Sequence, residues 1–214
     1  MDVLDRLDAE RARVDVLEHP FYVRWSRGEL TGEELADYGA QYRHLVVALA
    51  DLSAQAAETA HGGERAGLAA HAREEASHVG VWDQFADAMG STRAAPSPDT
   101  VAAAASWTAP QTLPEQLAAM YVIEASQPAI SETKLTGLGE HYGHQEDSAA
   151  CAYFSLHARL DVEHAEQARE LIRRAVDAGD RETHDRMVAA GRAALEGNWR
   201  MLDGVDREAA AVAA

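Results

Sequence analysis

Helical spacing is the feature of this sequence that most limits its fold. Between residues 31 and 59, apolar side chains recur three or four positions apart, at Leu35, Tyr38, Tyr42, Leu45 and Leu49. Apolar residues make up 47% of the 214 residues, and much of that share is alanine, a strong helix former. No run of β-branched residues alternates at period two, as a half-buried strand would. The sequence therefore predicts an all-α helical bundle.

We expect one domain over residues 1–214, because no linker divides the chain. A capping box at Thr31 and Glu34 opens the second of six expected helices. Pro128 should kink the fourth, and glycines 137, 139 and 143 should end it. The expected helices are residues 4 to about 19, 31–59, 64–90, 112 to about 137, 145–179 and 181 to beyond 199, with a short helical piece between 91 and 110.

Charge and composition restrict the function. The net charge of −17 argues against nucleic acid and anionic membranes as partners, since both attract basic surfaces. The first residues form no signal peptide, and no stretch is apolar enough to span a bilayer. Cys151 is the only cysteine, so an internal disulfide is excluded. We therefore expect a cytoplasmic protein, with a homodimer among the allowed oligomeric states.

Ionisable residues interrupt the apolar stripe of the third expected helix. The stripe contains His71, Glu75 and His78, and the last two form the Glu-x-x-His pattern with which helical bundles hold di-iron sites. Glu74, four residues before His78, is an alternative to Glu75. A solvated helix face would produce the same pattern.

Glu124 is the only charged residue between Glu115 and Glu132 on the fourth expected helix. A carboxylate among apolar neighbours is costly to bury unless it is paired or metal-bound. The alternative is a rotated stripe that lets Glu124 reach solvent.

The fifth expected helix carries the strongest signal. His157, Asp161 and His164 follow one another at i, i+4 and i+7, so they line one face, flanked by apolar residues. Three surface residues could share a face by chance, but Phe154 and Leu171 continue the same face inward. We interpret the line as metal ligands.

Together the three helices offer three carboxylates and three imidazoles: Glu75, His78, Glu124, His157, Asp161 and His164. This number suffices for two metal ions, and a mixed nitrogen and oxygen set suits iron or manganese. We therefore expect two iron ions, or one iron and one manganese, with O2 and a reductant as co-substrates. No nucleophile motif or phosphate-binding glycine loop competes with this interpretation.

These residues resemble the heme-oxygenase-like di-metal oxidases, a superfamily that includes the TenA thiaminases. Within it, the likeness is greatest to the self-sacrificing para-aminobenzoate synthases of the chlamydial death-domain-associating type. The stretches that carry it are HPFYVRWSRGEL at 19–30, EE at 74–75 with HVGVWDQFADAMG at 78–90, YVIEASQPAISETKLTGL at 121–138, and YFSLHARLDVEH at 153–164. The resemblance implies the TenA-like fold for the whole chain.

The resemblance also implies roles for two residues outside the ligand set. Tyr22 matches the tyrosine that the family sacrifices, and Lys134 matches its amino donor. Lys134 is the only lysine beside eighteen arginines, as expected for an amine that must react, although a leftover residue would look the same. The family has a tyrosine where this chain has Ile123, so Tyr121 becomes the expected electron relay.

Several functions remain open at this stage. The first is an oxygenase that makes para-aminobenzoate, a folate precursor, from Tyr22 with nitrogen from Lys134. The second is a di-iron oxidase that acts on an external amino-acid-like molecule by N-oxygenation, desaturation or C–C cleavage. A thiaminase-like hydrolase fits less well. Thiaminases use a cysteine on the fourth helix, and the fourth expected helix of this chain has none. A non-catalytic interaction protein would leave the buried ionisable residues unexplained.

Overall fold

The computed structural model describes residues 2–212, which fold into helices and contain no strand. This confirms the all-α prediction. The elements are α1 (Val3–Arg13), η1 (Val16–Glu18), α2 (Pro20–Ser26), α3 (Gly32–Thr59), α4 (Glu64–Ala88), α5 (Pro98–Thr108), α6 (Leu113–Glu124), α7 (Gln127–Glu140), α8 (Ala152–Ala178) and α9 (Arg181–Val212). No helix in the described part of the chain is both long and apolar enough to cross a membrane.

Local capping signals set several helix ends where the sequence predicts them. The N–H of Glu34 donates to the Thr31 hydroxyl at 3.2 Å, and the N–H of Thr31 donates to the Glu34 carboxylate at 2.8 Å. This reciprocal pair opens α3. Gly90 follows the end of α4 with φ of +72°, a conformation that glycine adopts without strain.

The His19-Pro20 step begins a helix instead of ending one. The first helix stops at Arg13, and α2 begins at Pro20, whose missing N–H costs nothing in a first turn. The ring Nδ1 of His19 accepts the N–H of Phe21 at 3.0 Å and caps α2. The prediction of one helix up to residue 19 was therefore wrong.

Three further features of the helices differ from the prediction. The expected kink near Pro128 is a complete break, and Pro128 lies in the first turn of α7. Gly137 and Gly139 lie inside α7, which ends at Glu140. Residues 145–151 form turns, so α8 begins at Ala152 and not at Gln145.

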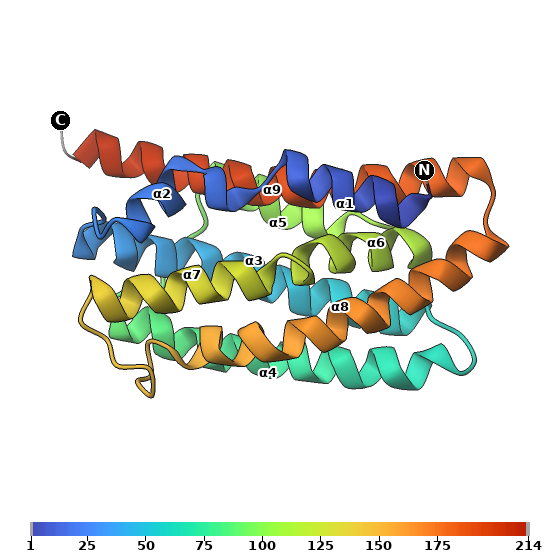
Figure 1. The fold of residues 1–214 in the computed structure, drawn as a ribbon, viewed down its shortest axis with the longest axis horizontal. Coiled ribbons are helices and arrows are strands. Elements are labelled where there is room, and N and C mark those ends of the chain that lie inside the picture. The colour runs from blue at the N-terminus through green and yellow to red at the C-terminus, as the bar shows by residue number, and fades with distance from the viewer. Residues whose placement is uncertain (1, 213–214) are drawn as a thin grey trace.

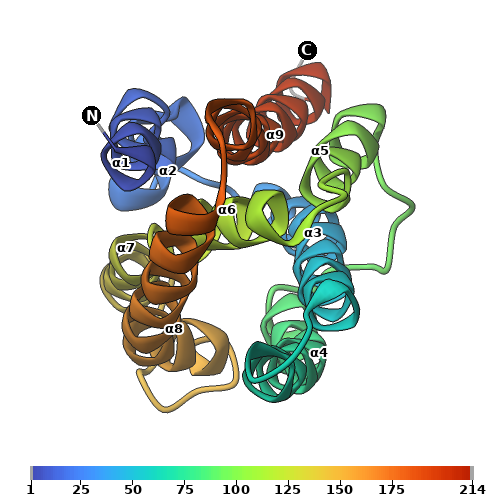
Figure 2. The same cartoon turned by 90° about the vertical axis from the view of Figure 1, so that its right-hand side faces the viewer.

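The helices form two groups that run along the long axis of the molecule (Figure 1). One group contains α3, α4, α8 and the broken pair α6 and α7; the other contains α1, α2, α5 and α9. In the end view, α3, α4, α6 and α8 surround one interior region (Figure 2). The helices that carry the expected metal ligands therefore face one another.

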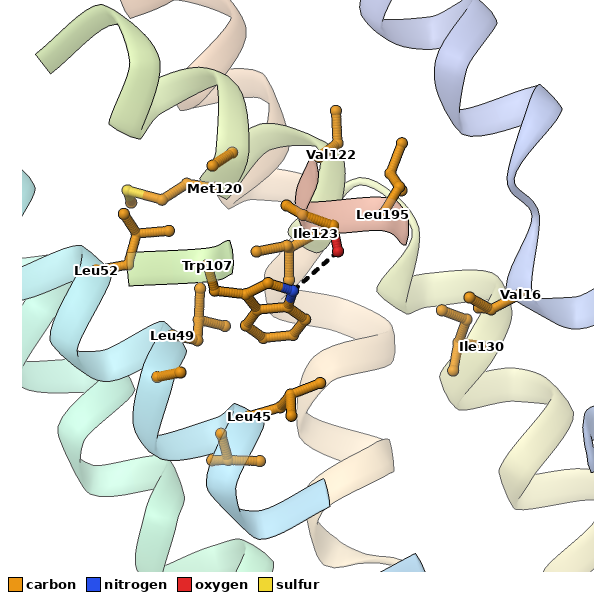
Figure 3. Packing of buried hydrophobic residues seen from close by; sticks show 14 of the residues in the cluster. Val16, Leu45, Leu49, Leu52, Trp107, Met120, Val122, Ile123, Ile130 and Leu195 are labelled. Carbon is orange, nitrogen blue, oxygen red and sulfur yellow. Dashed lines mark hydrogen bonds between the residues drawn. The ribbon is translucent and has the colours of Figure 1, made fainter. Parts of the chain in front are cut away.

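Trp107 joins the two groups. Its ring is buried beside Leu45 and Leu49 of α3, and its indole N–H donates to the Ala194 carbonyl of α9 at 2.9 Å (Figure 3). A buried indole N–H needs such an acceptor. These contacts hold α5 between α3 and α9. Helix α5 thereby supports α3, which borders the interior region.

Candidate metal centre

Helix α4 carries three inward-facing ionisable side chains in one line. His71, Glu75 and His78 stand four and three residues apart, so they share one face. All three are buried, and Glu75 is only 1% exposed. The side chain of Glu74, one position around the helix, is 39% exposed, with a carboxylate oxygen 3.4 Å from His164 Nε2. Glu75, and not Glu74, therefore lies on the buried face of α4.

Helix α8 presents a matching line of buried His157, Asp161 and His164. The Nδ1–H of His157 donates to the backbone carbonyl of Tyr153 at 2.8 Å, which leaves the lone pair on Nε2. Burial lowers the pKa of His157 to about 4, so its imidazole is neutral near pH 7. His157 is therefore in the form that binds metals.

Glu124 is the last residue of α6, at the break before α7. Its carboxylate is buried, and Oε1 lies 3.0 Å from Nε2 of His71 on α4. The alternative in which Glu124 reaches solvent is therefore excluded. The break in the backbone lets α6 end at the interior region that α4 and α8 border (Figure 2).

Two groups of potential ligand atoms share Glu75. One group joins His71, Glu75 and His164, the other joins Glu75, His78 and His157, and within each group the atoms lie within 4.8 Å of one another. Oε1 of Glu75 is 3.6 Å from His71 Nε2 and 3.2 Å from His78 Nδ1. This arrangement could hold two neighbouring metal ions with Glu75 between them.

Unpaired polar atoms show that the residues fit such a metal pair. At least one buried nitrogen or oxygen without a hydrogen-bond partner belongs to each of seven side chains: His71, Glu75, His78, Glu124, His157, Asp161 and His164. Leaving one such group unsatisfied costs about 1 to 3 kcal/mol. So many in one place would be a large penalty, which coordination removes. Carboxylate and imidazole donors together suit iron and manganese.

His71 is the residue that sequence reasoning left out of the ligand set. It stands four residues before Glu75 on the same stripe, and that spacing was the signal that could have found it. Burial lowers its pKa, but the carboxylates of Glu124 and Glu75 outweigh burial and raise it to about 10. Without a metal, His71 is therefore an imidazolium between two carboxylates. Metal binding must release its proton.

Lys134 forms a second cluster with the aromatic side chains of α2, α3, α4 and α8. Its side-chain nitrogen, Nζ, lies 4.8 to 5.6 Å from five ring centroids, those of Tyr22, Tyr38, Tyr42, Trp82 and Phe154. We call this group the Lys134 cage. Lys134 is 1% exposed, and burial lowers its pKa well below the usual 10.5. The amine is therefore held in a dry site that disfavours its charged form.

Tyr38 connects Lys134 with Tyr22. Lys134 Nζ donates to the Tyr38 hydroxyl at 2.5 Å, and that hydroxyl lies 3.2 Å from the hydroxyl of Tyr22. Nζ is 5.5 Å from the centroid of the Tyr22 ring. The structure thus brings together the two residues that the resemblance singles out.

Gly137 allows α2 to approach α7 closely enough for this contact. The indole of Trp25 lies against Gly137, where a Cβ would overlap it, and its N–H donates to the Lys134 carbonyl at 3.4 Å. Because Trp25 follows Tyr22 by one helical turn, this packing positions Tyr22 beside Lys134.

Tyr121 lies apart from the Lys134 cage. Its hydroxyl donates to the Asp8 carboxylate at 2.6 Å and also contacts Arg169. Among the described residues it has no aromatic contact with Tyr22. Its role as electron relay remains a prediction.

Tyr153 lies between the metal ligands and the Trp82 ring of the Lys134 cage. The ring of Tyr153 stacks on His157 with centroids 3.9 Å apart and lies 4.8 Å from Trp82. The Trp82 ring is 4.9 Å from that of Tyr42, which is 4.8 Å from Lys134 Nζ. Continuous aromatic contacts therefore connect the two clusters.

The fold and this buried set of imidazoles and carboxylates define a helical protein with a candidate metal site, and comparison with known proteins gives its family. Residues 36–199 match the model of a family described as "iron-containing redox enzyme". The match covers more than half of the chain, so the protein belongs to this family.

Curated relatives align over most of the chain. A protein of Chlamydia muridarum is 32% identical over 95% of this chain and 89% of its own length, and one of Nitrosomonas europaea is 30% identical over 89% and 85%. A third, from Chlamydia trachomatis, is 34% identical over 80% of each chain. Each of these three relatives is named 4-aminobenzoate synthase.

Solved structures confirm the expected fold. A TenA homologue from P. horikoshii OT3 covers 97% of this chain and 99% of its own, with a TM-score of 0.78 and 18% identity. A domain with a heme oxygenase-like fold from Shewanella denitrificans OS217 covers 97% and 93%, with a TM-score of 0.82 and 21% identity. The chain therefore has the TenA-like, heme-oxygenase-like fold.

Proposed function

We propose that this protein is an O2-dependent enzyme that forms 4-aminobenzoate from its own Tyr22, with the amine of Lys134 as the nitrogen source. The observation that carries the proposal is the buried Lys134 amine, 5.5 Å from the Tyr22 ring centroid and without a carboxylate partner among the described residues. The names of the relatives support the same product.

Seven side chains of α4, α6 and α8 would hold the metals, either two irons or one iron and one manganese: His71, Glu75, His78, Glu124, His157, Asp161 and His164. When bound, such a pair supplies the oxidising power of dioxygen, with electrons from an external reductant. Buried Glu75 is better placed than exposed Glu74 to lie between the two ions. This geometry supports Glu75 as the ligand.

Tyr22 can account for every carbon of the product. Its ring supplies the aromatic carbons, and its Cβ becomes the carboxyl carbon once the Cα–Cβ bond is cleaved oxidatively. Dioxygen is the oxidant. The Lys134 nitrogen bonds to the para carbon, and the para oxygen leaves as water. Oxidation of the Lys134 Cε and hydrolysis then break the Cε–N bond, which leaves an aldehyde at Cε. Because Tyr22 is fully buried, bulk water is kept from the ring during these steps.

Lys134 is suited to supply that nitrogen. The neutral amine keeps its lone pair, which an ammonium lacks, and burial favours the neutral form. Tyr38 accepts a hydrogen bond from Nζ and lies next to the Tyr22 hydroxyl, so it orients the amine toward the para oxygen. The contacts through Tyr153 and Trp82 offer electrons a path between Tyr22 and the metal ligands.

Product formation by two variants tests this proposal. Lys134→Arg keeps a long cation but removes the primary amine, so it should abolish 4-aminobenzoate while metal content is unchanged. Tyr22→Phe should do the same, whereas Tyr142→Phe, a control at a tyrosine outside the Lys134 cage, should retain product. Normal product from Lys134→Arg would refute the amine role, and product from Tyr22→Phe would refute Tyr22 as the source.

The second candidate function is oxidation of an external amino-acid-like molecule at the same metals. One observation favours it, because His71 and His164 also line a pocket that opens to solvent. Tyr22 and Lys134 would then remain intact after turnover.

A further inference from the structure

A pocket of about 760 Å³ lies between α4, α6 and α8. Its volume is in the range of small-molecule sites. Its walls include five apolar side chains, those of Leu68, Leu117, Met120, Ala168 and Leu171. Neither Tyr22 nor Lys134 lines it. The pocket therefore approaches the candidate metal centre without touching the Lys134 cage.

His71 and His164 are the pocket residues that belong to the metal centre. They are 9% and 6% exposed, and their rings stack with centroids 4.4 Å apart. Nε2 of His71 lies 3.0 Å from a Glu124 carboxylate oxygen and Nδ1 of His164 lies 3.5 Å from one of Asp161, but neither contact has the geometry of a hydrogen bond. A molecule in this pocket would therefore contact ligands of one of the two metal positions.

The outer part of the pocket is acidic. Four carboxylates line it, at Glu64, Glu163, Glu166 and Glu170, against one guanidinium. That guanidinium, Arg174, is itself paired with Glu170 at 3.1 Å. Arg173, beside the pocket, lies 3.6 Å from both Glu166 and Glu170, so the four carboxylates outnumber two guanidinium groups. Glu163 and Glu166 are exposed on the α8 surface. The electrostatic field at the opening therefore favours cations over anions.

We infer that this pocket binds a small organic ammonium compound with an apolar body. The ammonium would lie among the exposed carboxylates, and the apolar end would point between Leu68 and Leu171 toward His71 and His164. This inference rests on the proposed metal centre for its functional meaning, since it places an external molecule at the metals. The binding itself depends only on the shape and charge of the pocket.

A matched pair of probes tests the preference. 2-Phenylethylammonium and 3-phenylpropionate share a phenylethyl body and differ in the sign of the charge. Saturation-transfer NMR titrations of the metal-free protein at low salt should give about tenfold tighter binding of the cation, and added salt should reduce the difference. The double variant Glu163→Lys and Glu166→Lys should reverse the preference. Glu29→Lys with Glu33→Lys, remote from the pocket, should not.

Paramagnetic broadening locates the bound probe. With Mn²⁺-loaded protein, the ring protons of 2-phenylethylammonium should broaden more than the CH2 next to nitrogen, because the ring lies nearer the metal. Equal binding of the two probes, or a preference unchanged by the Glu163 and Glu166 variant, would overturn the inference. Failure of both Mn²⁺ and Fe²⁺ to bind would instead refute the metal centre, while the titrations of metal-free protein would still decide whether the pocket takes amines.

Discussion

Replacing Lys134 with methionine should stabilise the fold and remove a pH dependence from it. The Lys134 amine is surrounded by aromatic rings, and its one hydrogen-bond partner is the Tyr38 hydroxyl. Burial lowers its pKa well below the usual 10.5. Methionine has a similar length and no charge, so it should fill the same space without the cost of a buried amine.

The size of the effect follows from proton linkage. Because burial favours the neutral amine, folding must release the proton that an unfolded lysine carries below its usual pKa. Each pH unit below that pKa, down to the folded pKa, adds about 1.4 kcal/mol to the cost of folding. Because the unfolded state binds more protons, wild-type stability rises with pH between the folded and the unfolded pKa. The advantage of Lys134→Met should therefore be greatest at pH 7. As the pH rises, this advantage should fall by about 1.4 kcal/mol per pH unit, which is a tenfold change in the folding equilibrium constant.

Urea unfolding measures this difference directly. Metal-free wild type and Lys134→Met would be unfolded at pH 7, 8 and 9 in the presence of a chelator. Arg65→Met, at an exposed arginine outside both clusters, is the control and should show no such slope. A Lys134→Met effect that stays constant from pH 7 to 9 would mean that the amine is charged in the folded protein, and the argument for a reactive neutral amine would fail.

Three further substitutions address the two clusters. Glu75→Gln should reduce metal content much more than Glu74→Gln, and metal analysis giving the reverse order would move the ligand to Glu74. His157→Ala should lose at least one of about two ions bound per chain after anaerobic loading, whereas full occupancy would contradict the site. Gly137→Ala should cost about 1 to 3 kcal/mol in urea unfolding and suppress product, because a Cβ there overlaps the α2 indole. Gly139→Ala has no close neighbour and should do neither.

The ligand lines could be predicted because helical periodicity makes them visible. His157, Asp161 and His164 need no knowledge of tertiary structure, since their spacing alone places them on one face. His71 carries the same signal, but the residue three positions before it is Leu68, so it did not match the Glu-x-x-His motif. Its contact with Glu124 depends on the way α4 and α6 pack, which spacing within one helix cannot show.

The Lys134 cage could not be derived from spacing at all. Tyr22 and Lys134 lie on helices far apart in the sequence, and tertiary contacts, the packing of Trp25 on Gly137 and the hydrogen bonds through Tyr38, bring them together. The same limit explains the wrong end of the first helix. A proline stops a helix or starts one, and the decision at Pro20 depends on whether His19 turns back to cap the chain.

Isotope labelling of the protein itself tests the central claim most directly. Protein made with ring- and Cβ-labelled tyrosine would be loaded with iron and manganese and given O2 and a reductant, with no other substrate. The account predicts labelled 4-aminobenzoate, at most one molecule per chain, and a 20–26 peptide in which Tyr22 has lost its side chain. Unlabelled product, or labelled product from a protein whose 20–26 peptide is intact, would contradict it.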